Sequence, residues 1–120
     1  MIRSPRPRLS DIDQNIALVV AHVQGRTLDD FERDIAFRYM LLHALMIIAE
    51  AVRNLPPDLT GNYPDIPWSK IVGIGTKIKH EYHRVDSFVV WTAVTVHLRP
   101  LQTAVAQMIA EEDLATAGAQ

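Results

Sequence analysis

The side chains best suited to chemistry lie in one short run of the chain, residues 73–86. The run holds two histidines, two lysines, an arginine and a tyrosine. Thr76, Lys77, His80 and Arg84 recur three and four residues apart, which places them on one face if the run is helical. A histidine has an unperturbed pKa of about 6.5, so it can take up or release a proton near neutral pH. An imidazole among fixed positive charges suits chemistry on a phosphodiester.

A metal site is a weaker interpretation of the same run. His80 and His83 are three residues apart, a spacing that can hold a metal ion. The only carboxylate in step with them is Asp86, which is better explained as a helix cap, and no third histidine joins them. We therefore expect a solvated His83, no metal and no other cofactor. The chain has no cysteine, which excludes disulfides, thiolate metal ligands and cysteine nucleophiles.

Length and composition limit the class of protein. The 120 residues are enough for one domain with its own core. The formal net charge is −2 and the pI is about 6.2, which argues against a protein that coats long nucleic acid. Any contact with nucleic acid must therefore be confined to a small part of the surface. No apolar run is expected to reach the roughly 20 residues of a membrane span, so we expect a soluble, cytoplasmic protein.

The reactive run needs a helix to position it. The sequence predicts that helix over about residues 68–85, with Pro67 at its start. Its apolar residues recur at three- and four-residue spacing, as on the buried side of a helix. They are Ile71, Ile74, Ile78, Tyr82 and Val85.

Other periodic segments predict the remaining helices. One covers residues 9–23 and is ended by Gly25 in a left-handed cap. A long one covers residues 27–54, about 40 Å, and Thr27 opens it. A further helix over about residues 87–98 is capped by Asp86 or Ser87, and Pro100 breaks or kinks it before a short helix over about residues 101–109. Residues 55–67 are rich in proline and predict an irregular loop.

These elements predict an all-α fold, a four- to five-helix up-and-down bundle over residues 9–110. Residues 1–8 would form a basic, proline-broken tail, and residues 111–120 a frayed one. The long second helix is apolar on more than one side between Met40 and Val52, which implies burial on two sides. It is either the central helix of a monomer or the contact between two copies, and we expect the homodimer.

Several short motifs occur in the order found in one known family. They are Leu9-Ser10-Asp11-Ile12, Phe31-Glu32-Arg33-Asp34, Ile48-Ala49-Glu50-Ala51, Leu55-Pro56, Pro64-Asp65-Ile66-Pro67-Trp68 and His80-Glu81-Tyr82. In this order the chain resembles HepT-like proteins, small helical bundles of the HEPN superfamily. The resemblance extends from about residue 8 to residue 108, and the Ile-Pro-Trp entry followed by His-x-Tyr is its most specific part.

The resemblance implies the toxin of a bacterial toxin–antitoxin pair, a metal-independent ribonuclease that acts on RNA as a dimer. The implied partner is a minimal nucleotidyltransferase antitoxin, which in this family can transfer AMP to a tyrosine. His80 matches the family's catalytic histidine, and Tyr82 matches the modified tyrosine. Without the resemblance, the favoured interpretation of Tyr82 is a half-buried core tyrosine with its hydroxyl at the rim, and only the resemblance makes modification an equal alternative.

One departure from the family motif, Arg-x4-His-x-Tyr, stands out. The arginine position is Gly75, and the asparagine that usually follows is Thr76. This substitution favours a rival function, in which the chain is a catalytically weak binding subunit that docks a nucleotidyltransferase and accepts or presents a nucleotide. A third interpretation, a structural dimer without chemistry, fits the basic run least well.

Metal-free RNA cleavage needs a base, an acid and a cation for the charged phosphorane. His80 is the expected acid or base; the alternative is an exposed histidine on a solvated helix. Arg84, one turn later, or Lys77, three residues before, would supply the cation, and Lys79 would point elsewhere. A second copy in a dimer could supply a missing group.

Glu50 is a candidate supporting residue, because it lies in an otherwise apolar stretch of the long helix. It either anchors the basic run of the next helix, or turns to solvent or pairs locally with Arg53.

Overall fold

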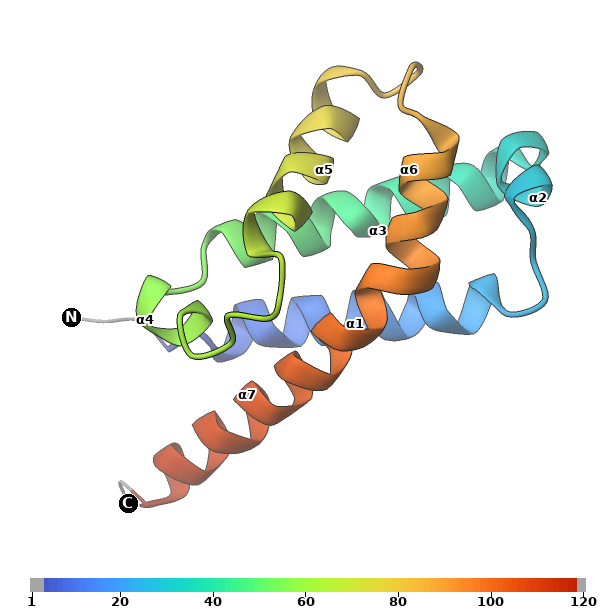
Figure 1. The fold of residues 1–120 in the computed structure, drawn as a ribbon. Helices are drawn as coiled ribbons and strands as arrows, with labels where there is room; N and C mark the ends of the chain where they lie inside the picture. Colours follow the sequence, from blue (N-terminus) through green and yellow to red (C-terminus); the bar gives the residue numbers. More distant parts are fainter. Residues whose placement is uncertain (1–3, 119–120) are drawn as a thin grey trace.

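The structure, a computed structural model, describes residues 4–118 (Figure 1). Within that range the chain is helical and has no strand, which confirms the predicted all-α fold. The elements are α1 (Arg6–Val23), α2 (Leu28–Arg33), α3 (Ile35–Arg53), α4 (Pro57–Thr60), α5 (Trp68–His80), α6 (Ser87–Thr92), the π-helical η1 (Ala93–His97) and α7 (Leu98–Gly118).

The core lies between α1, α3 and α7. α3 packs against both α1 and α5, and α1 also packs against α7 (Figure 1). The apolar stripe of α1 is fully buried, in agreement with its three- and four-residue spacing. Its members are Leu9, Ile12, Ile16 and Val19. Gly25 follows α1 with a φ of 72°, which confirms the predicted left-handed residue after this helix.

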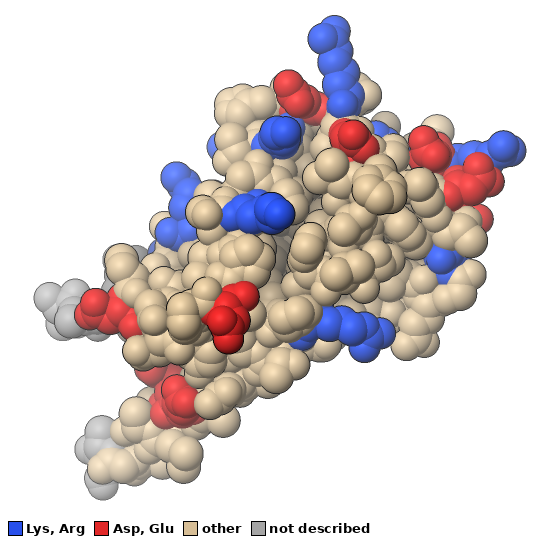
Figure 2. Space-filling model, in the orientation of Figure 1, with Lys and Arg blue, Asp and Glu red and all other residues tan. Residues whose placement is uncertain are grey.

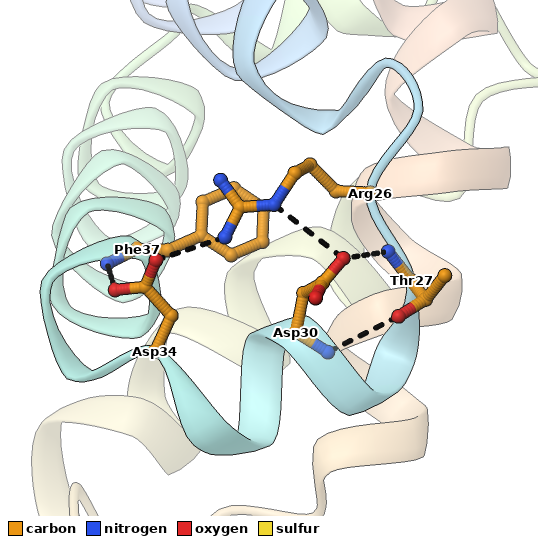
Figure 3. A network of polar contacts seen from close by, with 5 residues as sticks. All are labelled: Arg26, Thr27, Asp30, Asp34 and Phe37. Atoms are coloured by element: carbon orange, nitrogen blue, oxygen red, sulfur yellow. Dashed lines mark hydrogen bonds and ion pairs between the residues drawn. The ribbon is translucent and has the colours of Figure 1, made fainter.

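The predicted single helix over residues 27–54 is wrong, because Asp34 divides it into α2 and α3. Asp34 has an extended backbone, with φ −92° and ψ 100°, and its Oδ1 accepts a hydrogen bond from the Phe37 backbone N–H at 3.1 Å. The Arg26 guanidinium joins the two helix starts. It lies 2.9 Å from Asp34 Oδ2, 3.5 Å from Asp30 Oδ2 and 4.0 Å above the Phe37 ring (Figure 3).

This network predicts a pH-dependent stability. Hydrogen bonds from backbone N–H groups, with the Arg26 charge, hold the pKa values of Asp30 and Asp34 below the ordinary 3.8. A lowered folded-state pKa gives stability that is present above the unfolded pKa and is lost as the pH falls through the folded one. We expect Asp34→Ala to lower the unfolding temperature at neutral pH and to flatten its fall toward about pH 3. Asp65→Ala, at an exposed carboxylate in the proline-rich loop, is the control, and equal curves for both variants would contradict the prediction.

The C-terminal third follows one bent helical path. Asp86 Oδ1 accepts from the backbone N–H groups of Phe88 and Val89, which confirms the predicted cap of α6. Pro100 was predicted to break or kink the helix; the helix does not end there, because Pro100 lies in the first turn of α7 and the irregular turn is the π-helical η1 immediately before it. Pro100 lacks an N–H, and a wider turn before it accommodates that loss without ending the helix.

Both predicted tails are wrong over the described residues. α1 begins at Arg6, within the expected tail 1–8, and α7 continues to Gly118, through most of the expected frayed tail 111–120. Residues 1–3 and 119–120 lie outside the described residues. The start of α1 and the C-terminal part of α7 are in polar contact. Ser4 donates to Glu112 Oε1 at 2.9 Å, and Arg6 Nε lies 3.0 Å from Asp113 Oδ1.

The proline-rich segment sets the start of α5. It contains the short α4, and its turns are fixed by Trp68, the first residue of α5. Trp68 Nε1 donates to the carbonyl oxygens of Thr60 at 3.1 Å and Tyr63 at 3.0 Å. The indole therefore fastens the loop to the helix that carries the reactive run.

α3 is 19 residues long and strongly apolar. By length and composition alone it could cross a membrane, contrary to the expectation that no segment would qualify. Half of the qualifying segment is buried inside the molecule, as in the core helix of a globular protein. Its other side leaves Ile35 and Tyr39 exposed, at 64 % and 49 %.

Candidate functional site

A hollow of about 470 Å³ lies between α3 and α5 and contains the candidate acid or base, His80. Its α5 wall is formed by positions three and four residues apart, as expected for one side of a helix. The lining residues are Met46, Ala49, Glu50 and Arg53 of α3 and Val72, Gly75, Thr76, Lys79 and His80 of α5.

Gly75 is the point of close contact between these two helices. It is buried, and a Cβ placed on it would overlap the Cβ of Ala49. Position 75 is therefore a helix-packing position in this chain. An arginine there would have to push α5 away from α3 before its guanidinium could reach the hollow.

Glu50 and Arg53 form an ion pair at the α3 rim of the hollow. Arg53 Nη2 lies 2.8 Å from Glu50 Oε1, Arg53 Nε lies 3.3 Å from Glu50 Oε2, and Asn54 Nδ2 donates to Glu50 Oε1 at 3.3 Å. The hydrogen bonds from Arg53 lower the pKa of Glu50, and the Lys79 charge adds to the effect. Of the two alternatives for Glu50, the structure shows local pairing with Arg53.

The basic run does not share one face as predicted. α5 ends at His80, so Arg84 lies beyond the helix in the turn of residues 81–86, where its N–H donates to the Glu81 carbonyl at 2.7 Å. Lys77 lines a different hollow, of about 460 Å³, between α5 and α6. The expectation for Lys79 is wrong, because Lys79 lines the same hollow as His80.

His80 and Thr76 are both exposed within the hollow. The Thr76 hydroxyl donates to the Val72 carbonyl at 3.2 Å, one turn earlier in α5. His80 is the last residue of α5, so its ring lies where the helix stops and the chain turns away. The imidazole is open to solvent, and Lys79 of the same helix lines the same hollow.

Tyr82 is half-buried between two rings. Its ring centroid lies 5.7 Å from that of Tyr39 and 5.6 Å from that of His83. Burial raises the pKa of Tyr82, the neighbouring Tyr39 adds to the rise, and Arg38 opposes it. Among residues 4–118 the Tyr82 hydroxyl makes no hydrogen bond to another protein group. In the same range no side-chain oxygen or nitrogen is both buried and unpaired. That hydroxyl therefore reaches solvent.

Charge on the drawn surface is mixed. Figure 2 shows lysine and arginine side chains around α5 with acidic ones among them, and residues 4–118 form no continuous basic surface on that face. In the same range, no three histidine, aspartate or glutamate side chains come together as metal ligands would.

Sequence reasoning missed Arg53 as a site residue. It was considered only as a partner of Glu50, because the relative rotation of α3 and α5 cannot be obtained from periodicity. The available signal was a pair of small residues, Ala49 and Gly75, within apolar stripes of two successive helices. Such pairs indicate close backbone approach, and the close approach brings residue 53 to the same hollow as residue 80.

The fold and the hollow define a small all-α bundle whose imidazole lies in a cleft with two cationic side chains. The sequence model of the family described as "Ribonuclease HepT-like" matches residues 12–108. The chain belongs to the HepT-like ribonuclease family of the HEPN superfamily.

Curated relatives agree with this assignment. The chain is 30% identical over 111 residues to "Putative RNase TTE0752" of Caldanaerobacter subterraneus subsp. tengcongensis, covering 92% of this chain and 99% of the relative. It is 34% identical over 94 residues to "Probable ribonuclease HepT" of Thermococcus cleftensis, covering 78% and 86%. No solved structure matches the chain significantly. Membership of this family supports a ribonuclease role with RNA as the substrate class.

Proposed function

We propose that this chain is the toxin of a bacterial toxin–antitoxin pair, a cytoplasmic, metal-independent endoribonuclease with His80 as acid or base. One observation carries the proposal: in a chain of a ribonuclease family, His80 opens into a hollow that also contains Lys79 and Arg53. An imidazole can move the proton, and fixed cations stabilise the phosphorane.

The reaction needs no group from outside the protein and the RNA. A base removes the proton of a 2′-hydroxyl, and the oxygen attacks the adjacent phosphorus. The bond from phosphorus to the 5′-oxygen breaks, and an acid returns a proton to that oxygen. The products are a 2′,3′-cyclic phosphate and a 5′-hydroxyl. His80 performs one of the two transfers, and the His80 of a second copy can perform the other.

The proposed dimer uses the outer side of α3. Ile35 and Tyr39 are exposed there, and Met46 and Ile47, further along the helix, are half-buried. Tyr39 also contacts Tyr82, so this side of α3 is continuous with the end of the reactive run. A second copy on this side would bring its own residues toward the first hollow.

Purified protein should cleave single-stranded RNA with EDTA present, and the fragments should carry 2′,3′-cyclic phosphate ends. The physical reason is that the proton transfers and the charge stabilisation come from side chains. The measurement is gel analysis of an end-labelled RNA, with enzymatic identification of the new ends. Cleavage that stops with EDTA, or that leaves linear 3′-hydroxyl ends, would contradict the mechanism.

We further propose that a minimal nucleotidyltransferase antitoxin transfers AMP to Tyr82. The Tyr82 oxygen would attack the α-phosphorus of ATP, release pyrophosphate and lose its proton to a base of the partner. The solvent-accessible hydroxyl supports this role. Its neighbours Tyr39 and His83 hold the ring at the surface end of the reactive run.

After incubation with the cognate nucleotidyltransferase and ATP, mass spectrometry should find one AMP on the peptide that contains Tyr82. Tyr82→Phe should carry none, because it keeps the ring and lacks the attacking oxygen. Tyr63→Phe is the control, since Tyr63 is also half-buried and its hydroxyl lies 3.5 Å from Glu111 Oε1. An unmodified Tyr82 would rule out this part of the proposal.

The second candidate function is a catalytically weak subunit that docks the nucleotidyltransferase and accepts or presents a nucleotide. The observation in its favour is the packing role of Gly75, which leaves α5 without the motif arginine. Expression of the chain alone separates the two candidates. A ribonuclease toxin slows growth and its His80→Ala variant does not, whereas a binding subunit is harmless in both forms.

A further inference from the structure

We propose that Arg53, on α3, binds the scissile phosphate and supplies the guanidinium that α5 lacks at position 75. The inference rests on the proposed ribonuclease function and assigns a phosphate-binding residue to the same site. Arg53 lines the hollow that contains His80, although it lies outside the motif and on a different helix.

The first step of the argument is that α5 cannot provide this group. Position 75 is closed by the contact between Gly75 and Ala49. Lys77 lines the other hollow, and Arg84 lies beyond the end of the helix. The only cation that α5 contributes to the hollow is Lys79, whose ammonium binds as a point charge rather than as a planar fork.

The second step concerns which edge of the Arg53 guanidinium is free. Glu50 occupies the edge formed by Nε and Nη2, at 3.3 and 2.8 Å. A guanidinium has five N–H groups, so three remain, on Nη1 and Nη2. These form the end-on edge, which can bind two oxygens of a phosphate side by side. No side chain of residues 4–118 other than Glu50 accepts from Arg53, and its side chain is 61% exposed.

The third step is that Glu50 positions the guanidinium. The pair is bidentate, and Asn54 donates to the same carboxylate at 3.3 Å, so the plane of the guanidinium is fixed on the α3 rim. The lowered pKa of Glu50 keeps it ionised at neutral pH, which leaves one positive charge in excess in the hollow from Arg53 and Lys79 together. A phosphate that enters meets that charge and the free edge of Arg53.

The test compares RNA cleavage by wild type, Arg53→Ala and Arg53→Lys with that by Arg33→Ala. Arg33 is the matched control, because it is an exposed helical arginine whose Nε lies 2.9 Å from Asp29 Oδ1 and it is not among the residues that line the hollow. We expect Arg53→Ala to lower kcat/KM about 100-fold, Arg53→Lys to recover part of the loss, and Arg33→Ala to act as wild type. Circular dichroism confirms that each variant is folded.

A binding measurement separates this inference from the proposed function. In the His80→Ala background, binding of a single-stranded RNA is measured against salt concentration. Loss of Arg53 should reduce the slope of log K against log salt by about 0.7, the contribution of one phosphate contact. If loss of Arg53 changes neither the salt slope nor the cleavage rate, the inference about Arg53 is wrong. If His80→Ala is inactive in the same experiment, the proposed ribonuclease function still holds. If wild type cleaves no RNA, the function fails, and the slope still decides whether Arg53 binds phosphate.

Discussion

His80→Ala should lower the rate of RNA cleavage by a factor of about 100 to 10,000 and leave the fold intact. A positioned acid or base contributes a rate enhancement of about that size. The side chain is exposed at the last residue of α5, so its removal leaves no cavity in the core. The measurement is the cleavage rate of a labelled RNA with EDTA present, together with growth after expression of the variant.

The matched control for His80→Ala is His22→Ala. His22 is likewise exposed and near the end of a helix, where its Nδ1 lies 2.8 Å from the Leu18 carbonyl oxygen, and it does not line the hollow. The His22→Ala variant should cleave RNA at the wild-type rate. If His80→Ala cleaves RNA or slows growth as wild type does, the imidazole has no part in the reaction, and the binding-subunit function becomes the better one.

Gly75→Ala should destabilise the protein by about 1–2 kcal/mol, although alanine is the better helix former. Alanine in place of a mid-helix glycine gains about 0.5–1 kcal/mol, whereas an extra methyl group in a packed contact costs about 1–3 kcal/mol. At position 75 the contact is with the Ala49 methyl, and the steric cost dominates. Gly75→Arg should be more destabilising still. Chemical denaturation measures both.

Two further variants isolate the helix contact as the cause. Gly73→Ala, two residues earlier in α5, has nothing within 4 Å of the new Cβ and should gain about 0.5–1 kcal/mol. Ala49→Gly combined with Gly75→Ala should recover most of the lost stability, with a coupling energy of about 1 kcal/mol or more. Destabilisation by Gly73→Ala, or additive effects of the pair at 49 and 75, would show that the cost has another origin.

Helix type and the main caps were predictable because they depend on local spacing. The stripe of α1, the left-handed Gly25 and the cap at Asp86 depend on neighbours within a few residues. The break at Asp34 was not predictable from periodicity, because the apolar pattern continues through it. Its stabilising partner, Arg26, is eight residues away and bridges two helix starts.

The site was predictable only in part. The family resemblance singled out His80, the last residue of α5, and Tyr82, two residues beyond it. Helical spacing predicted that Lys77, rather than Lys79, would lie beside His80. Spacing gives the positions around one helix, but it does not show which side of that helix a second helix covers. The covering is decided by the crossing at Ala49 and Gly75, and that crossing also brings Arg53 into the hollow.

The contact between Ala49 and Gly75 also constrains the order in which this sequence can change. A lineage that acquires arginine at position 75 first must pass through an ancestor whose helices are forced apart. A lineage that first exchanges Ala49 for glycine removes the methyl group that a Cβ at position 75 would overlap. The accessible mutational path between this chain and an arginine-bearing descendant therefore runs through residue 49, on a helix that the motif does not include.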